Sequence, residues 1–305
     1  MLQGSGRPRP TLLLMLLRLS LALLAVLALG GAWVGLGLER QAQPVLRLAS
    51  TTSTQDSGLL DYLLPLFEAQ CDIEVAVVAK GTGAAIRDGL AGQVDALLVH
   101  NQVREEALVA EGYALARLPI MSNDFLLVGP KSQMPEADLQ ALLARFAAGE
   151  RGLFFSRGDQ SGTHAAEQRL WQAFGHDPQT FGSWYAKTGT GMGQTLITTN
   201  LNSGATLVDS ATWARHQGRA DLHVLHTGAT PGLANPYGYL ALNPDRVPGV
   251  NAALAEQLGA WLTSPTGQAA IASYSVGGMR AFTPASDLAS VADSEDDTLV
   301  CLPSR

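Results

Sequence analysis

Short apolar runs alternate along the chain with segments in which apolar residues recur every three or four positions. The apolar runs predict strands at 45–49, 73–79, 94–99, 125–128, 152–156, 205–208, 223–226 and 237–242. The helical spacing predicts helices at 58–70, 83–92, 104–111, 137–148, 163–174, 194–202, 210–217, 250–262 and 268–274. Strands that alternate with helices in this way are typical of an α/β fold with mostly parallel sheets.

The first forty residues have the pattern of a targeting segment. Arg7, Arg9 and Arg18 form a basic head, and residues 19–38 carry no charge. The small residues Gly30-Gly31-Ala32 suit cleavage after Ala32, so residues 1–32 are expected to be a signal peptide. The alternative is an uncleaved anchor at 19–38. Both place the rest of the chain in the periplasm or on the extracytoplasmic face of the membrane.

Charge and cysteine content narrow the function classes. Without the three N-terminal arginines, 17 basic residues face 27 acidic ones, a net charge of −10 that argues against nucleic-acid binding. Cys71 and Cys301 either pair, which an oxidising compartment allows, or remain thiols. No Cys/His cluster has zinc spacing, and we expect neither a metal site nor a cofactor. The acidic tail at 289–305 lacks apolar periodicity and is expected to be disordered.

Three polar loops each follow a predicted strand and open a predicted helix. They are Thr51-Thr52-Ser53-Thr54, Gly81-Thr82-Gly83 and the segment 156–164. Hydroxyls and backbone N–H groups at a helix N-terminus can hold a small anion without a matching buried cation. Because ligands of α/β proteins bind at the carboxyl ends of strands, the three loops predict one anion site. The alternative for the first two loops is ordinary turn chemistry.

The third loop is the most specific of the three. Arg157 supplies a fork of donors, and Ser161, Gly162 and Thr163 lie where the next helix begins. In the structural alternative, Arg157 pairs with Asp159 on the surface and Ser161 caps the helix. The glycine-rich turn at 189–193 could add further backbone N–H groups.

A hydrolase is the competing class of function. Ser161 and His164 lie three residues apart, but no Gly-x-Ser-x-Gly elbow and no orienting acid accompany them. We therefore expect that the protein is not an enzyme. His100, at a strand end, could line a cleft or have a structural role.

Seven segments together resemble one known family. They are LASTTSTQDSGLL at 48–60, GTG at 81–83, DALLVH at 95–100, NDF at 123–125, SRGDQSGTH at 156–164, GTGMG at 189–193 and NPYG at 235–238. The family is the tungstate-binding periplasmic component of ABC transporters, which is related to the molybdate-, sulfate- and phosphate-binding proteins. The resemblance runs from about residue 46 to 285.

The resemblance implies a two-lobed periplasmic binding protein of type II-like fold. Two crossing strands near 122–127 and 235–240 would form the hinge. Lobe I would comprise 45–122 plus 237–288, and lobe II 123–236. It implies that the anion is bound by Thr52, Ser53 and Thr82 from lobe I and by Arg157, Ser161, Gly162 and Thr163 from lobe II.

The implied function is capture of tungstate by a monomer that delivers it to an ABC transporter permease. Molybdate, sulfate or phosphate as the ligand, and a membrane-anchored oxyanion sensor, are the alternatives. The chain departs from the family at Val208-Asp209-Ser210, where the usual triplet is Thr-Asp-Arg. Arg215 or Lys187 could replace the missing arginine.

Overall fold

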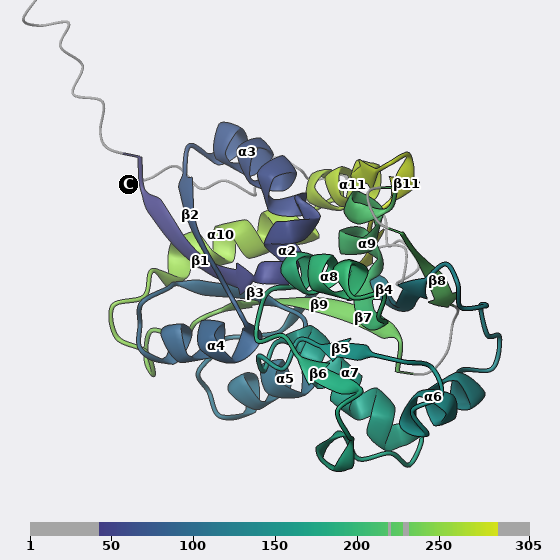
Figure 1. Cartoon of the computed structure of the whole chain (residues 1–305). Helices are drawn as coiled ribbons and strands as arrows, with labels where there is room; N and C mark the ends of the chain where they lie inside the picture. The colour runs from purple at the N-terminus through teal and green to yellow at the C-terminus, as the bar shows by residue number, and fades with distance from the viewer. Residues whose placement is uncertain (1–42, 219–220, 228–231, 286–305) are drawn as a thin grey trace, which may run out of the picture. The chain divides into compact units, whose positions relative to one another are not determined.

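The computed structural model describes residues 43–218, 221–227 and 232–285 (Figure 1). The predicted signal peptide at 1–32, the alternative anchor at 19–38 and the tail at 289–305 lie outside these residues. Cys301 lies outside them too, so its pairing with Cys71 stays a prediction. Within the described residues, none of the helices combines the length and hydropathy that crossing a bilayer requires.

One mixed sheet forms the centre of the described chain. Its strands are β1 (Val45–Thr51), β2 (Glu74–Lys80), β3 (Ala96–Val99), β4 (Leu118–Pro130), β7 (Thr206–Asp209), β8 (Leu222–His226), β9 (Ala234–Ala241) and β12 (Thr283–Pro284). The order is β12-β4-β9-β3-β1-β2, and β7 and β8 also pair with β4. Two small sheets join β5 (Phe154–Ser156) to β6 (Tyr185–Lys187), and β10 (Ser275–Val276) to β11 (Met279–Arg280).

The sequence predicts mostly parallel sheets, and this part of the prediction is wrong. Parallel pairing is confined to β2-β1-β3 and β5-β6, whereas β4 and β9 pair antiparallel with each other and with their other neighbours. The reason lies in the length of β4. Its first half pairs with β9 and its second half with β7 and β8, so it runs through both parts of the sheet against its neighbours. The predicted strand at 125–128 covers only the second half.

Helices cover both faces of the sheet (Figure 1). They are α2 (Thr52–Ser57), α3 (Leu59–Cys71), α4 (Thr82–Leu90), α5 (Gln102–Ala110), α6 (Leu139–Ala147), α7 (Gly162–Ala173), α8 (Met192–Leu201), α9 (Ser210–His216), α10 (Ala252–Thr263) and α11 (Pro265–Ser273), with the 3-10 turn η1 (Pro178–Thr180). Every helix predicted from the spacing is present, with ends shifted by a few residues.

The polar run after β1 is helical, which the sequence did not indicate. Thr51 caps α2 by accepting a hydrogen bond from the backbone N–H of Thr54 at 3.2 Å. Gly58 then adopts φ 77°, a left-handed conformation that ends α2 and begins α3 at a new angle. The hydroxyl run therefore forms the first turn of a helix instead of a loop.

The buried apolar side chains gather in separate clusters. One set comes from residues 46–121 and 237–282, with Ala211 as the exception among the described residues. The other set comes from residues 125–233. Two cores on either side of the crossing strands support the predicted lobe boundaries at 122–123 and 236–237. The division into lobes stays a prediction.

Two pairs of parallel strands bring four helix starts together in register. Thr51 at the end of β1 is level with Lys80 at the end of β2, and these strands lead into α2 and α4. Ser156 at the end of β5 is level with Lys187 at the end of β6, which precede α7 and α8. Each pair presents two helix N-termini at one edge of its sheet.

Candidate anion-binding site

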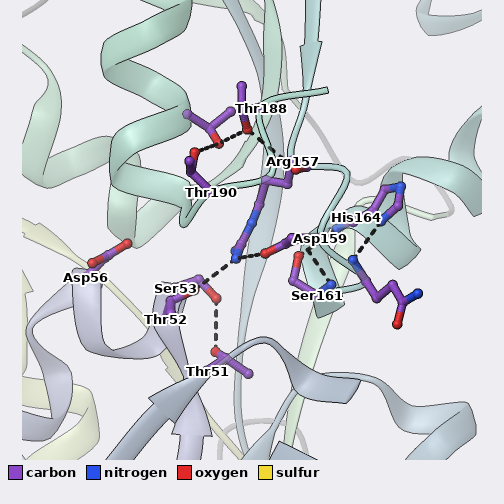
Figure 2. Close-up of polar contacts among 12 residues, drawn as sticks. Thr51, Thr52, Ser53, Asp56, Arg157, Asp159, Ser161, His164, Thr188 and Thr190 are labelled. Atoms are coloured by element: carbon purple, nitrogen blue, oxygen red, sulfur yellow. Dashed lines mark hydrogen bonds and ion pairs between the residues drawn. The ribbon is translucent and has the colours of Figure 1, made fainter. Parts of the chain in front are cut away.

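Arg157 is the buried charge of this region. It follows β5 and is 1% exposed, and its Nη2 donates to the Thr52 hydroxyl at 2.9 Å and to the Asp159 carboxylate at 2.5 Å (Figure 2). The other two guanidinium nitrogens, Nε and Nη1, are buried and have no hydrogen-bond partner within the described residues. A buried guanidinium with two unused donors is suited to binding an anion.

Asp159 holds Arg157 in place. Its other oxygen accepts a hydrogen bond from the Ser161 backbone N–H at 3.1 Å. Burial by itself would raise the pKa of Asp159, but the charge of Arg157 and the hydrogen bonds of Ser161 and Arg157 together lower it. The pairing of Arg157 with Asp159 that the structural alternative proposed is present, but Arg157 is buried and Asp159 is half-buried, so the pair is not on the surface.

Two threonine hydroxyls in this region have no partner within the described residues. Thr82 at the start of α4 is 0% exposed and Thr163 in the first turn of α7 is 1% exposed. The capping residue of α4 is Gly81, whose lack of a side chain leaves the helix start without a side-chain cap. An unpaired buried hydroxyl costs about 1–3 kcal/mol, so both positions favour a ligand that accepts hydrogen bonds.

The starts of the four helices lie against one another. A Cβ added to Gly81 would lie 3.4 Å from the Asp159 carbonyl oxygen, so the start of α4 meets the loop before α7. A Cβ added to Gly191 would lie 3.6 Å from the Thr52 hydroxyl, so the start of α8 meets the start of α2. The hydrogen bond of Arg157 to Thr52 links these two contacts, so helix N-termini and one guanidinium lie near one another, which favours negative charge there.

Ser161 and Gly162 shape the start of α7. The Ser161 hydroxyl caps the helix by accepting a hydrogen bond from the His164 backbone N–H at 3.2 Å. A Cβ on Gly162 would lie 2.7 Å from the His100 ring, so only glycine lets α7 approach this histidine. Ser53 also contacts His100, and its hydroxyl is 3.0 Å from His100 Nε2.

Six of the seven predicted anion-binding residues have polar side chains, and these divide into two groups. Arg157, Thr82 and Thr163 carry donors that no acceptor among the described residues uses. Thr52 accepts from Arg157, and Ser53 and Ser161 already take part in hydrogen bonds within the protein. The seventh, Gly162, lies against His100.

The geometry gives no support to the hydrolase alternative. His164 Nδ1 accepts a hydrogen bond from the Gln160 backbone N–H at 3.0 Å (Figure 2). Burial lowers the pKa of His164, against the opposing charge of Asp159. The Ser161 hydroxyl meets the backbone of His164 and not its ring, so the pair lacks the nucleophile–base contact that such catalysis needs.

The comparisons with known proteins agree with this arrangement. The PBP superfamily domain matches residues 39–266. The tungstate-binding protein TupA of Peptoclostridium acidaminophilum is 39% identical over 77% of this chain and 82% of its own length. TupA of Campylobacter jejuni is 33% identical over 70% of this chain and 80% of its own length.

The chain belongs to the PBP superfamily and, within it, to the TupA family.

Solved structures of this family have the same fold. TupA of Desulfovibrio alaskensis superimposes with a TM-score of 0.68 at 36% identity, covering 79% of this chain and 98% of its own. The tungstate ABC transporter protein of Geobacter sulfurreducens superimposes with a TM-score of 0.67 at 39% identity, covering 77% of this chain and all of its own. The chain is thus an α/β protein of the periplasmic binding protein class.

The two basic residues that could replace the missing arginine lie in different places. Arg215 Nη1 lies 1.9 Å from where a Cβ of Gly58 would be, at the junction of α2 and α3. Lys187 is exposed and packs its stem against Gly158, the residue that follows Arg157. Ser210 is the first residue of α9, which Asp209 caps through the Thr212 N–H at 2.9 Å. Replacement of the arginine by either residue stays a prediction.

One inter-helix contact was not foreseen from the sequence. The Asp56 carboxylate in α2 accepts a hydrogen bond from the Gly193 backbone N–H at the start of α8, at 3.1 Å. Asp56 thus caps a helix that begins more than 130 residues later in the chain, which no local pattern could indicate.

Proposed function

We propose that this protein captures tungstate outside the cytoplasm, between lobe I (45–122 plus 237–288) and lobe II (123–236), and delivers it to an ABC transporter permease. The observation that carries the proposal is the set of unused buried donors on Arg157, Thr82 and Thr163, at the place where four helix starts meet. The names of the TupA relatives support the same ligand.

The donor set favours a fully deprotonated oxyanion. Tungstate and molybdate carry no proton at neutral pH, so they need only donors, whereas phosphate keeps a proton that needs an acceptor. Two carboxylates at the helix starts are engaged: Asp159 with Arg157 and Ser161, and Asp56 with Gly193. At these two carboxylates, a phosphate would have to compete for an acceptor that the protein already uses.

The number of donors is sufficient for tight binding. A hydrogen bond to a charged group contributes about 1.5–3 kcal/mol. Micromolar binding corresponds to about −8 kcal/mol, so about six such bonds exceed this value before the costs of desolvation and lobe closure. Arg157 with Thr52, Thr82, Thr163 and the first N–H groups of α4 and α7 can supply that number.

The crossing strands provide a route for opening. β4 contributes Met121 to one set of buried clusters and Phe125 to the other, and β9 pairs with it along this stretch, so bending the two strands there would separate the clusters without exposing either core. The contacts of Thr52 with Arg157 and of Asp56 with Gly193 would break on opening and release the anion.

We further propose that the protein acts as a monomeric binding component without catalytic activity. Its place outside the cytoplasm rests on the predicted signal peptide at 1–32 or the anchor at 19–38. Mass spectrometry of the N-terminus after secretion separates these two alternatives: a chain beginning at Trp33 is a cleaved protein, and an intact N-terminus is an anchored one.

Titration calorimetry tests the ligand. We expect sub-micromolar binding of tungstate, and competition titrations with molybdate, sulfate and phosphate give the order of preference. Binding of tungstate weaker than ~10 μM would overturn the proposal. Tighter binding of another oxyanion would keep the site but change its cargo.

A further inference from the structure

A continuous series of side-chain hydrogen bonds runs from β7 to α2. Asn123 Nδ2 donates to Asp209 Oδ1 at 3.4 Å, and Asn235 Nδ2 donates to Asn123 Oδ1 at 2.7 Å. His100 Nδ1 lies 2.8 Å from Asn235 Oδ1, and His100 Nε2 lies 3.0 Å from the Ser53 hydroxyl. All five residues are buried, and Asn123 and Asn235 are in the crossing strands β4 and β9.

The donor and the acceptor of each of these hydrogen bonds can be assigned by starting from Asp209, at one end of the series. Asp209 Oδ1 already accepts the Thr212 backbone N–H at 2.9 Å, so it is an acceptor and Asn123 must present its NH₂ group to it. The Asn123 amide oxygen therefore faces Asn235, whose NH₂ group donates to it and also faces the Tyr237 hydroxyl at 3.2 Å. This leaves the Asn235 oxygen toward His100, so His100 carries its proton on Nδ1.

The proton on Nδ1 of His100 determines whether the Ser53 hydroxyl donates or accepts in its hydrogen bond with the ring. His100 is 3% exposed, and burial lowers its pKa to about 4, with the charges of Arg157 and Arg169 acting in the same direction and the Asn235 bond against it. The ring is neutral at physiological pH, and its Nε2 carries a lone pair. The Ser53 hydroxyl must then donate to His100.

We propose that His100 is a positioning residue that directs the Ser53 hydroxyl proton away from the anion and ties the start of α2 to both crossing strands. The proposal rests on the proposed function and refines the predicted site. Ser53 then offers the anion no hydroxyl proton. Thr52 does, because its oxygen accepts from Arg157 and its own proton remains available.

The contacts of the ring make it suited to this task. His100 stacks on Tyr237 of β9 with 4.8 Å between ring centroids and an interplanar angle of 22°. Its other side lies against Gly162 at the start of α7. The ring thus touches a crossing strand and one helix start, and bonds to a second helix start through Ser53, so its position affects how α2 and α7 meet.

The first test is spectroscopic and needs no ligand. Nitrogen-15 NMR of the histidine rings in the wild-type protein, with His100 assigned by comparison with His100→Gln, distinguishes the two neutral tautomers. We expect a protonated Nδ1 and an unprotonated Nε2 for His100, unchanged when tungstate is absent. A proton on Nε2, or a ring that exchanges between the two forms, would overturn the proposal.

The second test compares variants by tungstate calorimetry. Glutamine offers an NH₂ group that donates and a carbonyl oxygen that accepts, so it can replace both roles of the imidazole, and His100→Gln should stay within about threefold of wild type, whereas His100→Leu should weaken binding about tenfold or more. A packing role alone would make the two variants alike. Equal affinities of the two variants would therefore contradict a positioning role.

Ser53→Ala keeps the proposal testable if His100→Leu does not fold. Ser53→Ala should weaken tungstate binding by about threefold. This is less than the tenfold loss expected when a donor to the dianion is removed, as in Thr82→Val. A tenfold loss in Ser53→Ala would show that Ser53 donates to the anion. Failure of the wild type to bind tungstate would overturn the proposed function but leave the NMR result to decide the state of His100.

Discussion

Two turns of the same composition have opposite uses in this protein. Gly81-Thr82-Gly83 opens α4, and Gly189-Thr190-Gly191 opens α8. In both helices the N-cap residue is a glycine, which provides no side-chain cap. The Thr82 hydroxyl is buried without a partner among the described residues, whereas the Thr190 hydroxyl lies 3.3 Å from that of Thr195.

The backbone of the second turn is also occupied. The Gly189 N–H donates to the Arg157 carbonyl at 2.8 Å, and the Gly193 N–H donates to Asp56 at 3.1 Å. The second turn therefore holds Arg157 and α2, while the first keeps donors for a ligand. A helix start is available to an anion only where the rest of the chain has not supplied an acceptor.

Removal of Arg157 should cause the largest loss of tungstate affinity, and the losses caused by variants of the two turns can be compared with it. Arg157→Ala removes the buried cation and leaves the Asp159 carboxylate facing the anion, so we expect a loss of about 2–4 kcal/mol, which is about 30- to 1000-fold in Kd. Tungstate calorimetry measures it. Arg145→Ala, which changes an exposed arginine of α6, is the control and should bind like wild type. Wild-type affinity in Arg157→Ala would place the site elsewhere.

Added methyl groups should affect the two sides differently. Gly162→Ala places a Cβ 2.7 Å from the His100 ring, which is held by hydrogen bonds and stacking, so we expect at least about a tenfold weaker affinity. Gly191→Ala places its Cβ 3.6 Å from the nearest atoms, an ordinary contact, and should change the affinity by about twofold. If Gly162→Ala loses no more tungstate affinity than Gly191→Ala, the His100 ring can move aside to admit the added methyl group.

Substitutions of Thr82 and Thr190, one in each turn, test the difference between the two turns most directly. Thr82→Val removes a donor that no protein group uses, so tungstate affinity should fall about tenfold. The melting temperature without ligand should not fall, because a buried unpaired hydroxyl is lost. Thr190→Val should change the affinity by about twofold. If Thr190→Val is the more damaging variant, the assignment of the two turns is reversed.

The smallest effect is expected for the contact between α2 and α8. Asp56→Ala leaves the Gly193 N–H without its acceptor, so the closed arrangement loses about 1 kcal/mol and the dissociation rate of tungstate rises by about three- to fivefold. Stopped-flow dissociation measures it. Asp61→Asn alters an exposed carboxylate on α3 and should have no effect. An unchanged rate in Asp56→Ala would show that this contact does not hold the lobes.

Sequence patterns were reliable where neighbouring residues decide the structure. The apolar run of β1 and the helical spacing of α3 and α10 correspond to the observed elements, because burial of an amphipathic face follows directly from its periodicity. The hydroxyl run at 51–54 is predicted as a loop, because it lies between the strand pattern that ends at residue 49 and the helical pattern that begins at residue 58. Its capping by Thr51 and the turn at Gly58 made it α2.

The sequence alone determined the α/β class and the polar helix starts, because each depends on residue types next to one another in the chain; the role of Arg157 as an anion ligand stays a prediction. Tertiary structure alone decided which donors are left for an anion. Arg157, which pairs with Asp159, is buried, Asp56 occupies the start of α8, and His100 holds the Ser53 hydroxyl. The physical reason is that a donor's availability depends on the acceptors that folding brings within about 3 Å of it, and most of these come from distant parts of the chain.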